Sequence, residues 1–90
     1  MNYQIFYHPE IQSDIAGLPK DVKERIQKAI EKKLLVDPLH YAIPLRRSLR
    51  GYRKLRVGDY RVILKIDNKN IAVLKIGHRK EVYSKVHLRG

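Results

Sequence analysis

The spacing of apolar residues changes its period near the middle of the chain. Between residues 20 and 36, apolar side chains recur every three or four positions, whereas between 54 and 76 they alternate with polar ones in three short runs. The first period is that of one face of an α-helix, and the second is that of a β-strand. The sequence therefore predicts an α+β domain in which helices precede an antiparallel sheet.

The N-terminal half is predicted to hold one strand and two helices. A run of β-formers at Tyr3–Tyr7 predicts the opening strand, and a short helix starts at His8-Pro9-Glu10. Gly17-Leu18-Pro19 breaks that helix, and a second one extends from Lys20 to about Val36, where Asp37-Pro38 ends it. Their regular apolar spacing predicts an antiparallel hairpin of helices that packs on one face of the sheet.

The C-terminal half is predicted to form a three-stranded antiparallel meander. Residues 39–51 show no clear period and are expected to form a basic loop. The strands are expected at residues 54–57, 60–66 and 71–76, with turns at Gly58-Asp59 and at residues 67–70. Because 90 residues cannot build a second core, we expect residues 1–90 to form a single domain.

Charge decides which partners this domain can have. Twenty Lys and Arg residues oppose nine Asp and Glu, which gives a net charge of +11 and indicates a polyanionic partner, first of all nucleic acid. The sequence has no cysteine, so disulfides, thiolate zinc sites and thiol nucleophiles are excluded. Its apolar runs are too short for a membrane span, and the sequence Met1–Ile5 does not resemble a secretory signal. We therefore expect a cytoplasmic protein without a membrane partner.

Strand alternation sorts the residues of the meander onto two faces. The face toward the helices is expected to carry Leu55, Val57, Val62, Leu64, Ile66, Ala72, Leu74 and Ile76. The other face is expected to carry Lys54, Arg56, Arg61, Ile63, Lys65, Val73, Lys75, Gly77 and Arg79. Because a helix pair covers only one face, this second face is expected to be open and to bind phosphates. The basic loop, with Arg46, Arg47 and Arg50, borders it.

The residue types on this face limit its chemistry. The basic half has no paired carboxylates, since Asp59 stands alone at a turn, and no glycine-rich phosphate loop. The four histidines His8, His40, His78 and His87 lack the spacing of metal ligands. We therefore expect neither a metal nor a cofactor. Arg, Lys and Tyr suit RNA cleavage, because RNA supplies its own 2′-hydroxyl nucleophile and guanidinium groups stabilise charge that develops on the phosphate.

The sequence resembles the RelE/ParE toxin superfamily over nearly its whole length. The resemblance lies in residues 51–63 (GYRKLRVGDYRVI), in Ile76-Gly77-His78-Arg79 and in Val82-Tyr83. It implies a RelE-like fold and the toxin of a type II toxin–antitoxin system. RelE-like members are implied to cleave messenger RNA in the ribosomal A site, without a metal, and to leave a 2′,3′-cyclic phosphate. The implied partners are an acidic RelB-like antitoxin and the ribosome with its message; operator DNA is contacted only through the antitoxin complex.

Matched position by position, the resemblance implies four catalytic residues. Arg61 corresponds to the phosphate-stabilising arginine, and Arg79 to one that stabilises the transition state or protonates the leaving oxygen. Lys54 corresponds to a lysine that assists the 2′-hydroxyl, and Tyr83 to a tyrosine that orients the substrate. The candidate phosphate-binding residues are Arg46, Arg47, Arg50, Arg53, Arg56, Lys65, Lys75 and His78. Tyr52 departs from the pattern, since some relatives have a second lysine there.

Two other functions remain open at this point. A ParE-like relative would poison DNA gyrase on the same scaffold without nuclease activity. A plain RNA- or ribosome-binding module would use the basic face for affinity alone. Arg61, Arg79 and Tyr83 together favour the nuclease. The alternation of strand residues had placed the first two of these on one face without the resemblance, which points the same way.

Overall fold

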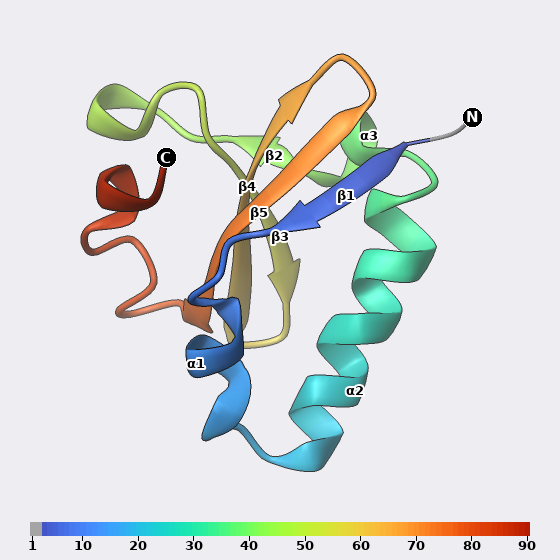
Figure 1. Cartoon of the computed structure of the whole chain (residues 1–90), viewed down its shortest axis with the longest axis vertical. Helices are drawn as coiled ribbons and strands as arrows, with labels where there is room; N and C mark the ends of the chain where they lie inside the picture. The colour runs from blue at the N-terminus through green and yellow to red at the C-terminus, as the bar shows by residue number, and fades with distance from the viewer. Residues whose placement is uncertain (1–2) are drawn as a thin grey trace.

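The computed structural model describes residues 3–90; Met1 and Asn2, which begin the segment expected to lack a secretory signal, lie outside the described residues. Within this range five strands form one mixed sheet of order β1-β5-β4-β3-β2 (Figure 1). The strands are β1 (Gln4–Tyr7), β2 (Ile43–Pro44), β3 (Arg53–Val57), β4 (Tyr60–Asp67) and β5 (Asn70–His78). β3, β4 and β5 form the expected antiparallel meander, and β1 pairs in parallel with β5. The predicted α+β class is confirmed.

The helices depart from the prediction in detail. They are α1 (Ile11–Ala16), α2 (Lys20–Ala29), a π turn (Ile30–Leu34) and α3 (Pro38–Tyr41), with 3₁₀ turns at Arg47–Leu49 and Val86–Arg89. The predicted single helix up to Val36 is thus an α-helix that changes to a π turn, in which Leu35 N–H donates to the Ile30 carbonyl. Asp37 then leaves helical geometry before Pro38, which opens α3 at a position where proline is favourable.

Part of the predicted basic loop is ordered secondary structure. Residues 39–51 contain most of α3, the two-residue strand β2 and one 3₁₀ turn. β2 pairs with β3 through Ile43↔Lys54 and Pro44↔Arg53. Each of these elements is only two to four residues long, too short to show a period in the sequence.

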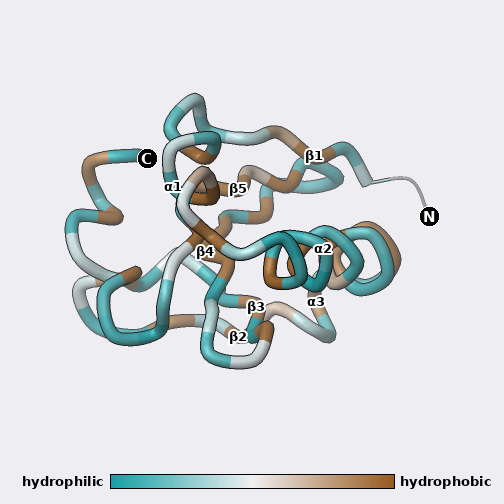
Figure 2. The backbone as a smooth tube through the Cα atoms, turned by 90° about the horizontal axis from the view of Figure 1, so that it is seen from below, coloured by the Kyte–Doolittle hydropathy of each residue, from teal (hydrophilic) through white to brown (hydrophobic). Residues whose placement is uncertain are grey.

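The main core lies between the sheet and the helices. The buried face of α2 and the π turn contributes Ile26, Ile30 and Leu34, which pack toward Val62 and Leu64 on β4. Figure 2 shows this arrangement from below, with hydrophobic positions of α2 turned toward the strands. None of the helices among residues 3–90 has the length and apolar character that a bilayer span requires.

A β-bulge reverses the side-chain pattern within β5. Ile63 pairs with Lys75, and the next residue, Leu64, pairs with Val73, so Leu74 is an extra residue on its strand. Val73 therefore packs in the main core, while Ala72 and Leu74 belong to a second apolar cluster on the opposite face. The prediction was wrong for these three residues, because one inserted residue turns the side chains beyond it to the other face. It was right for Ile76, which lies after the bulge.

The sheet face expected to be open is partly covered. Residues 79–90, called the C-terminal segment below, lie across the strands from α2 (Figures 1 and 2). Their Val82 and Val86 are buried against Ile63, Leu74 and Tyr52 in the second apolar cluster. The prediction missed this cover because residues 79–90 have no regular apolar spacing. Lys54, Arg56 and Arg61 nevertheless stay accessible to solvent.

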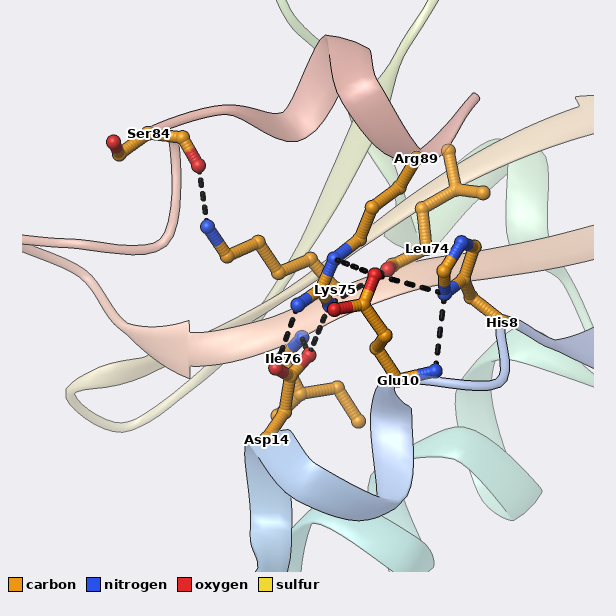
Figure 3. A network of polar contacts seen from close by, with 8 residues as sticks. All are labelled: His8, Glu10, Asp14, Leu74, Lys75, Ile76, Ser84 and Arg89. Atoms are coloured by element: carbon orange, nitrogen blue, oxygen red, sulfur yellow. Dashed lines mark hydrogen bonds and ion pairs between the residues drawn. The ribbon is translucent and has the colours of Figure 1, made fainter.

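A polar network fixes the C-terminal segment to α1 and β5 (Figure 3). Arg89 donates from Nη1 to Asp14 Oδ2 at 2.6 Å and from Nη2 to Oδ1 at 3.1 Å, and its Nη1 also reaches the Leu74 carbonyl at 3.2 Å. Asp14 Oδ2 also accepts the backbone N–H of Ile76 at 3.0 Å. The hydrogen bond to Asp14 raises the pKa of Arg89, so the guanidinium stays charged. The Asp14 carboxylate thus joins the C-terminal segment to the part of β5 that extends past its pairing with β1.

Candidate functional site

Three of the predicted cations gather at one pocket beside β3. Lys54 and Arg56 share a face of β3, and Arg56 is the register partner of Arg61 on β4. This confirms the predicted common face of the three side chains. A pocket of about 520 Å³ lies at this edge of the sheet and is lined by Lys33, Tyr41, Ile43, Lys54, Leu55, Arg56 and Arg61.

The backbone of the β3–β4 turn orients Arg61. Its Nη1 donates to the Gly58 carbonyl at 2.8 Å and to the Tyr60 carbonyl at 2.9 Å. A guanidinium carries five N–H donors, and these two bonds use the pair on Nη1. Among the hydrogen bonds of the described residues, none engages Arg61 Nε or Nη2. That edge has the fork geometry that binds a phosphate through two parallel hydrogen bonds.

Glycine at position 58 makes room for another arginine at this turn. Gly58 has φ +61°, and a Cβ there would lie 2.5 Å from Nη2 of Arg25 on α2. Arg25 therefore packs over the turn whose carbonyl holds Arg61. Sequence reasoning did not identify Arg25, because one charge among many on a solvated helix carries no signal of which distant residue it contacts.

Arg79 lies at the other side of the same turn and is paired with Asp59. The Arg79 N–H donates to the Asp59 carbonyl at 2.8 Å, and Arg79 Nε lies 3.6 Å from Asp59 Oδ1. Asp59, which has no second carboxylate near it in the sequence, is therefore the counter-ion of Arg79. Both side chains are largely exposed, at 53% and 73%, so the pair contributes at most about 1 kcal/mol. The pair is therefore too weak to fix the Arg79 guanidinium in place.

The four predicted catalytic residues do not share one pocket. Lys54 and Arg61 line the pocket at β3, whereas Arg79 and Tyr83 are not among its lining residues. Tyr83 is half-buried in the C-terminal segment and packs against the second apolar cluster. The structure thus brings together two of the four, with Arg79 at the other side of the β3–β4 turn.

Two candidate phosphate ligands lie on the side of the sheet that faces the helices. Arg53 pairs in register with the buried Leu64, and its Nη1 donates to the Ala42 carbonyl at 2.7 Å. His78 pairs with Tyr60, and the centres of the two rings lie 5.7 Å apart in an edge-to-face contact. Arg53 and His78 therefore do not extend the surface that Lys54 and Arg61 form.

The other candidate phosphate ligands lie either on β4 and β5 beneath the C-terminal segment or in the β2–β3 connection. Lys65 Nζ donates to the Gly90 carbonyl and lies 4.7 Å from the Tyr52 ring centre, and Lys75 Nζ donates to the Ser84 carbonyl. Both lysines thus hold the C-terminal segment on the sheet. Arg46, Arg47 and Arg50 are exposed in the β2–β3 connection, outside the pocket.

The pocket also contains residues that the sequence analysis did not select. Lys33 comes from the π turn, Tyr41 from the end of α3 and Ile43 from β2. Lys33 Nζ lies 5.6 Å from the centre of the Tyr41 ring. Tyr41 could have been selected from the sequence, because it is an aromatic residue within a basic segment. Across residues 3–90, no group of three or more His, Asp or Glu side chains is placed to hold a metal ion.

Comparison with known proteins agrees with this architecture. Residues 5–83 match the family model of the ParE toxin of the type II toxin–antitoxin system parDE. The chain is 28% identical over 85 residues to toxin RelG of Mycobacterium tuberculosis, covering 92% of this chain and 98% of that protein. Its structure resembles a chain of the M. tuberculosis RelBE2 toxin–antitoxin complex, with a TM-score of 0.81, 27% identity, and coverage of 88% of this chain and 100% of that one. It also resembles a chain of the archaeal RelE–RelB complex of Pyrococcus horikoshii, with a TM-score of 0.73, 27% identity, and coverage of 90% and 99%.

Proposed function

The chain belongs to the RelE/ParE superfamily of type II toxin–antitoxin toxins, and on that premise we propose that it is a ribosome-dependent endoribonuclease that cleaves messenger RNA in the A site. One observation carries the proposal: Lys54 and Arg61 meet at one pocket, and Arg61 keeps a free donor edge. The toxin–antitoxin complexes of its relatives support an antitoxin as its partner. An acidic antitoxin would neutralise the excess positive charge.

The proposed reaction uses the nucleophile of the RNA itself. Lys54 orients the 2′-hydroxyl and stabilises negative charge on its oxygen, and the proton passes to solvent as the 2′-oxygen bonds to phosphorus. The bond from phosphorus to the 5′-oxygen breaks and this oxygen takes up a proton from solvent, which leaves a 2′,3′-cyclic phosphate and a 5′-hydroxyl end. Arg61 binds the phosphate oxygens through Nε and Nη2, where negative charge develops. Within residues 3–90, Lys54 makes no hydrogen bond or ion pair that would compete with this role.

Arg79 and Tyr83 complete the proposed site from the C-terminal side. Arg79 exchanges its surface contact with Asp59 for the phosphate or the leaving oxygen, since the exposed pair is weak. Tyr83 orients the nucleotide from the C-terminal segment, which the second apolar cluster holds in place. Arg56, next to Arg61 across the strands, adds a further phosphate ligand.

Mapping message ends on translating ribosomes tests the proposal. We expect new ends within A-site codons by primer extension, and a loss of cleavage rate of about 100-fold or more for Arg61→Ala, because a donor to a developing oxyanion contributes that much. Arg61→Lys should not restore full activity, since a lysine cannot form the two-pronged contact. Lys54→Ala should be similarly impaired, and its control Lys28→Ala, an exposed lysine of α2, should cleave normally.

A second candidate function arises because the matching family model is that of ParE toxins. The ParE-like alternative is a gyrase poison, which would produce linearised plasmid and a DNA-damage response. Growth arrest with those signs and without new message ends would refute the nuclease. Arrest that needs neither Arg61 nor Lys54 would also count against it.

A further inference from the structure

The pocket at β3 extends beyond the residues assigned to the scissile phosphate. β2 pairs only with Arg53 and Lys54, so the edge of β3 beyond Lys54 has no strand beside it. Four of the seven lining residues are cations, namely Lys33, Lys54, Arg56 and Arg61, and among the described residues no carboxylate lines the pocket. Tyr41, Ile43 and Leu55 form its uncharged wall. The pocket therefore offers an aromatic surface beside a dense positive charge.

The aromatic wall is exposed yet held in a fixed position. The side chains of Tyr41 and Ile43 are 40% and 53% exposed. Between them, Ala42 is buried, donates its N–H to the Pro38 carbonyl and accepts a hydrogen bond from Arg53. Such anchoring of an exposed tyrosine lowers the entropy that it would lose on binding. Lys33 above the ring is an exposed side chain whose contact a ligand phosphate can replace.

We propose that this pocket is a subsite for a nucleotide that flanks the scissile phosphate. Its base stacks against Tyr41 beside Ile43, and its phosphate is bound by Lys33 and Arg56. This inference rests on the proposed function, because Lys54 and Arg61 on the same pocket are the groups assigned to the scissile phosphate. Single-stranded RNA brings one planar base and one anion per nucleotide, which matches the wall and the cations together. A peptide strand added to β3 would leave the cations unpaired unless it were acidic.

Binding of an RNA that cannot be cleaved tests the subsite. The probe is a fluorescein-labelled hexauridylate with every 2′-hydroxyl methylated, and its affinity is measured by anisotropy. Base stacking on an aromatic side chain corresponds to roughly 5- to 150-fold in affinity, so Tyr41→Ala should weaken binding by at least fivefold. Tyr41→Phe should bind within about twofold of the unchanged protein. The control Tyr7→Ala removes a comparably exposed tyrosine of β1 outside this pocket and should change nothing.

Two further measurements separate stacking from charge. An abasic hexamer with the same phosphates should bind the unchanged protein more weakly than hexauridylate, and Tyr41→Ala should largely abolish this discrimination. Lys33→Ala should lower the slope of log affinity against log salt by about 0.7, the value for one phosphate contact on a single strand. An unchanged slope would refute the role of Lys33.

The outcomes distinguish the subsite from the nuclease. The subsite is refuted if Lys54→Ala and Arg61→Ala weaken RNA binding while Tyr41→Ala retains both affinity and base discrimination. The remaining occupant for the edge of β3 is then an added strand of a protein partner. If binding depends on Tyr41 but translating ribosomes show no cleavage, the proposed nuclease fails and the RNA subsite stands. Circular dichroism of Tyr41→Ala checks that an altered fold does not cause the loss.

Discussion

Replacing Asp14 by alanine should destabilise the protein far more than replacing Asp59, although both aspartates pair with an arginine. The Asp14 and Arg89 side chains are only 10% and 14% exposed, and Asp14 also accepts the Ile76 N–H. The substitution leaves a nearly buried guanidinium with only the exposed Glu10 carboxylate, 3.6 Å from its Nε, and one backbone donor without a partner. Breaking a buried pair costs about 3–5 kcal/mol, and the residual exposure of this one lowers our expectation to about 3 kcal/mol.

Urea unfolding followed by circular dichroism measures this difference. With a slope of about 1.5 kcal/mol/M, a loss of ~3 kcal/mol moves the midpoint down by about 2 M. Asp59→Ala breaks an exposed pair with Arg79 and should cost less than about 1 kcal/mol. In a double-mutant cycle, Asp14→Ala and Arg89→Leu should show a coupling of about 2 kcal/mol. Equal costs for the two aspartates, or no coupling, would refute the idea that this pair secures the C-terminal segment.

Two further predictions concern the β3–β4 turn and the first strand. Gly58→Ala should lower the free energy of unfolding by about 1–2 kcal/mol in thermal unfolding, because φ +61° disfavours a side chain. It should also lower the cleavage rate, because a shift of the turn displaces Arg61, which donates to the Gly58 carbonyl. Unchanged stability would contradict the left-handed turn. Burial, aided by the charge of Glu31, raises the pKa of Tyr7, so absorbance at 295 nm should show it ionising above pH 10. Because the pKa of Tyr7 is higher in the folded than in the unfolded protein, the stabilisation of the fold by neutral Tyr7 is complete below pH 10. This stabilisation is lost as the pH rises through the pKa of Tyr7 in the folded protein. Glu31→Gln should lower this pKa only in part, since burial is the larger cause.

Strand alternation predicted the candidate site where the strands are regular. Lys54, Arg56 and Arg61 lie on β3 and at the start of β4, before the bulge, so their common face followed directly from the sequence. At Val73 and Leu74 the same reasoning failed. Both residues are apolar and either can be buried, so nothing in the sequence marks which of them is the inserted one.

The cover of the second sheet face could not be predicted from local patterns. Val82 and Val86 are buried by contact with β4 and β5, but their own segment consists of turns without a repeating period. The same holds for Tyr41 and Ile43, which come from elements of four and two residues. Their place in the pocket depends on how distant segments pack together, which alternation and helical spacing do not encode.

The contact between Asp14 and Arg89 joins residues 75 positions apart along the chain. Strand β1 likewise pairs with β5, which follows the other described strands in the sequence. A growing chain can form its helices early, but it can close neither contact until β5 and Arg89 have been synthesised. Such long-range closure is slow compared with local helix formation. The sheet therefore gains its parallel strand and its C-terminal anchor later in folding than the helices that cover its other face.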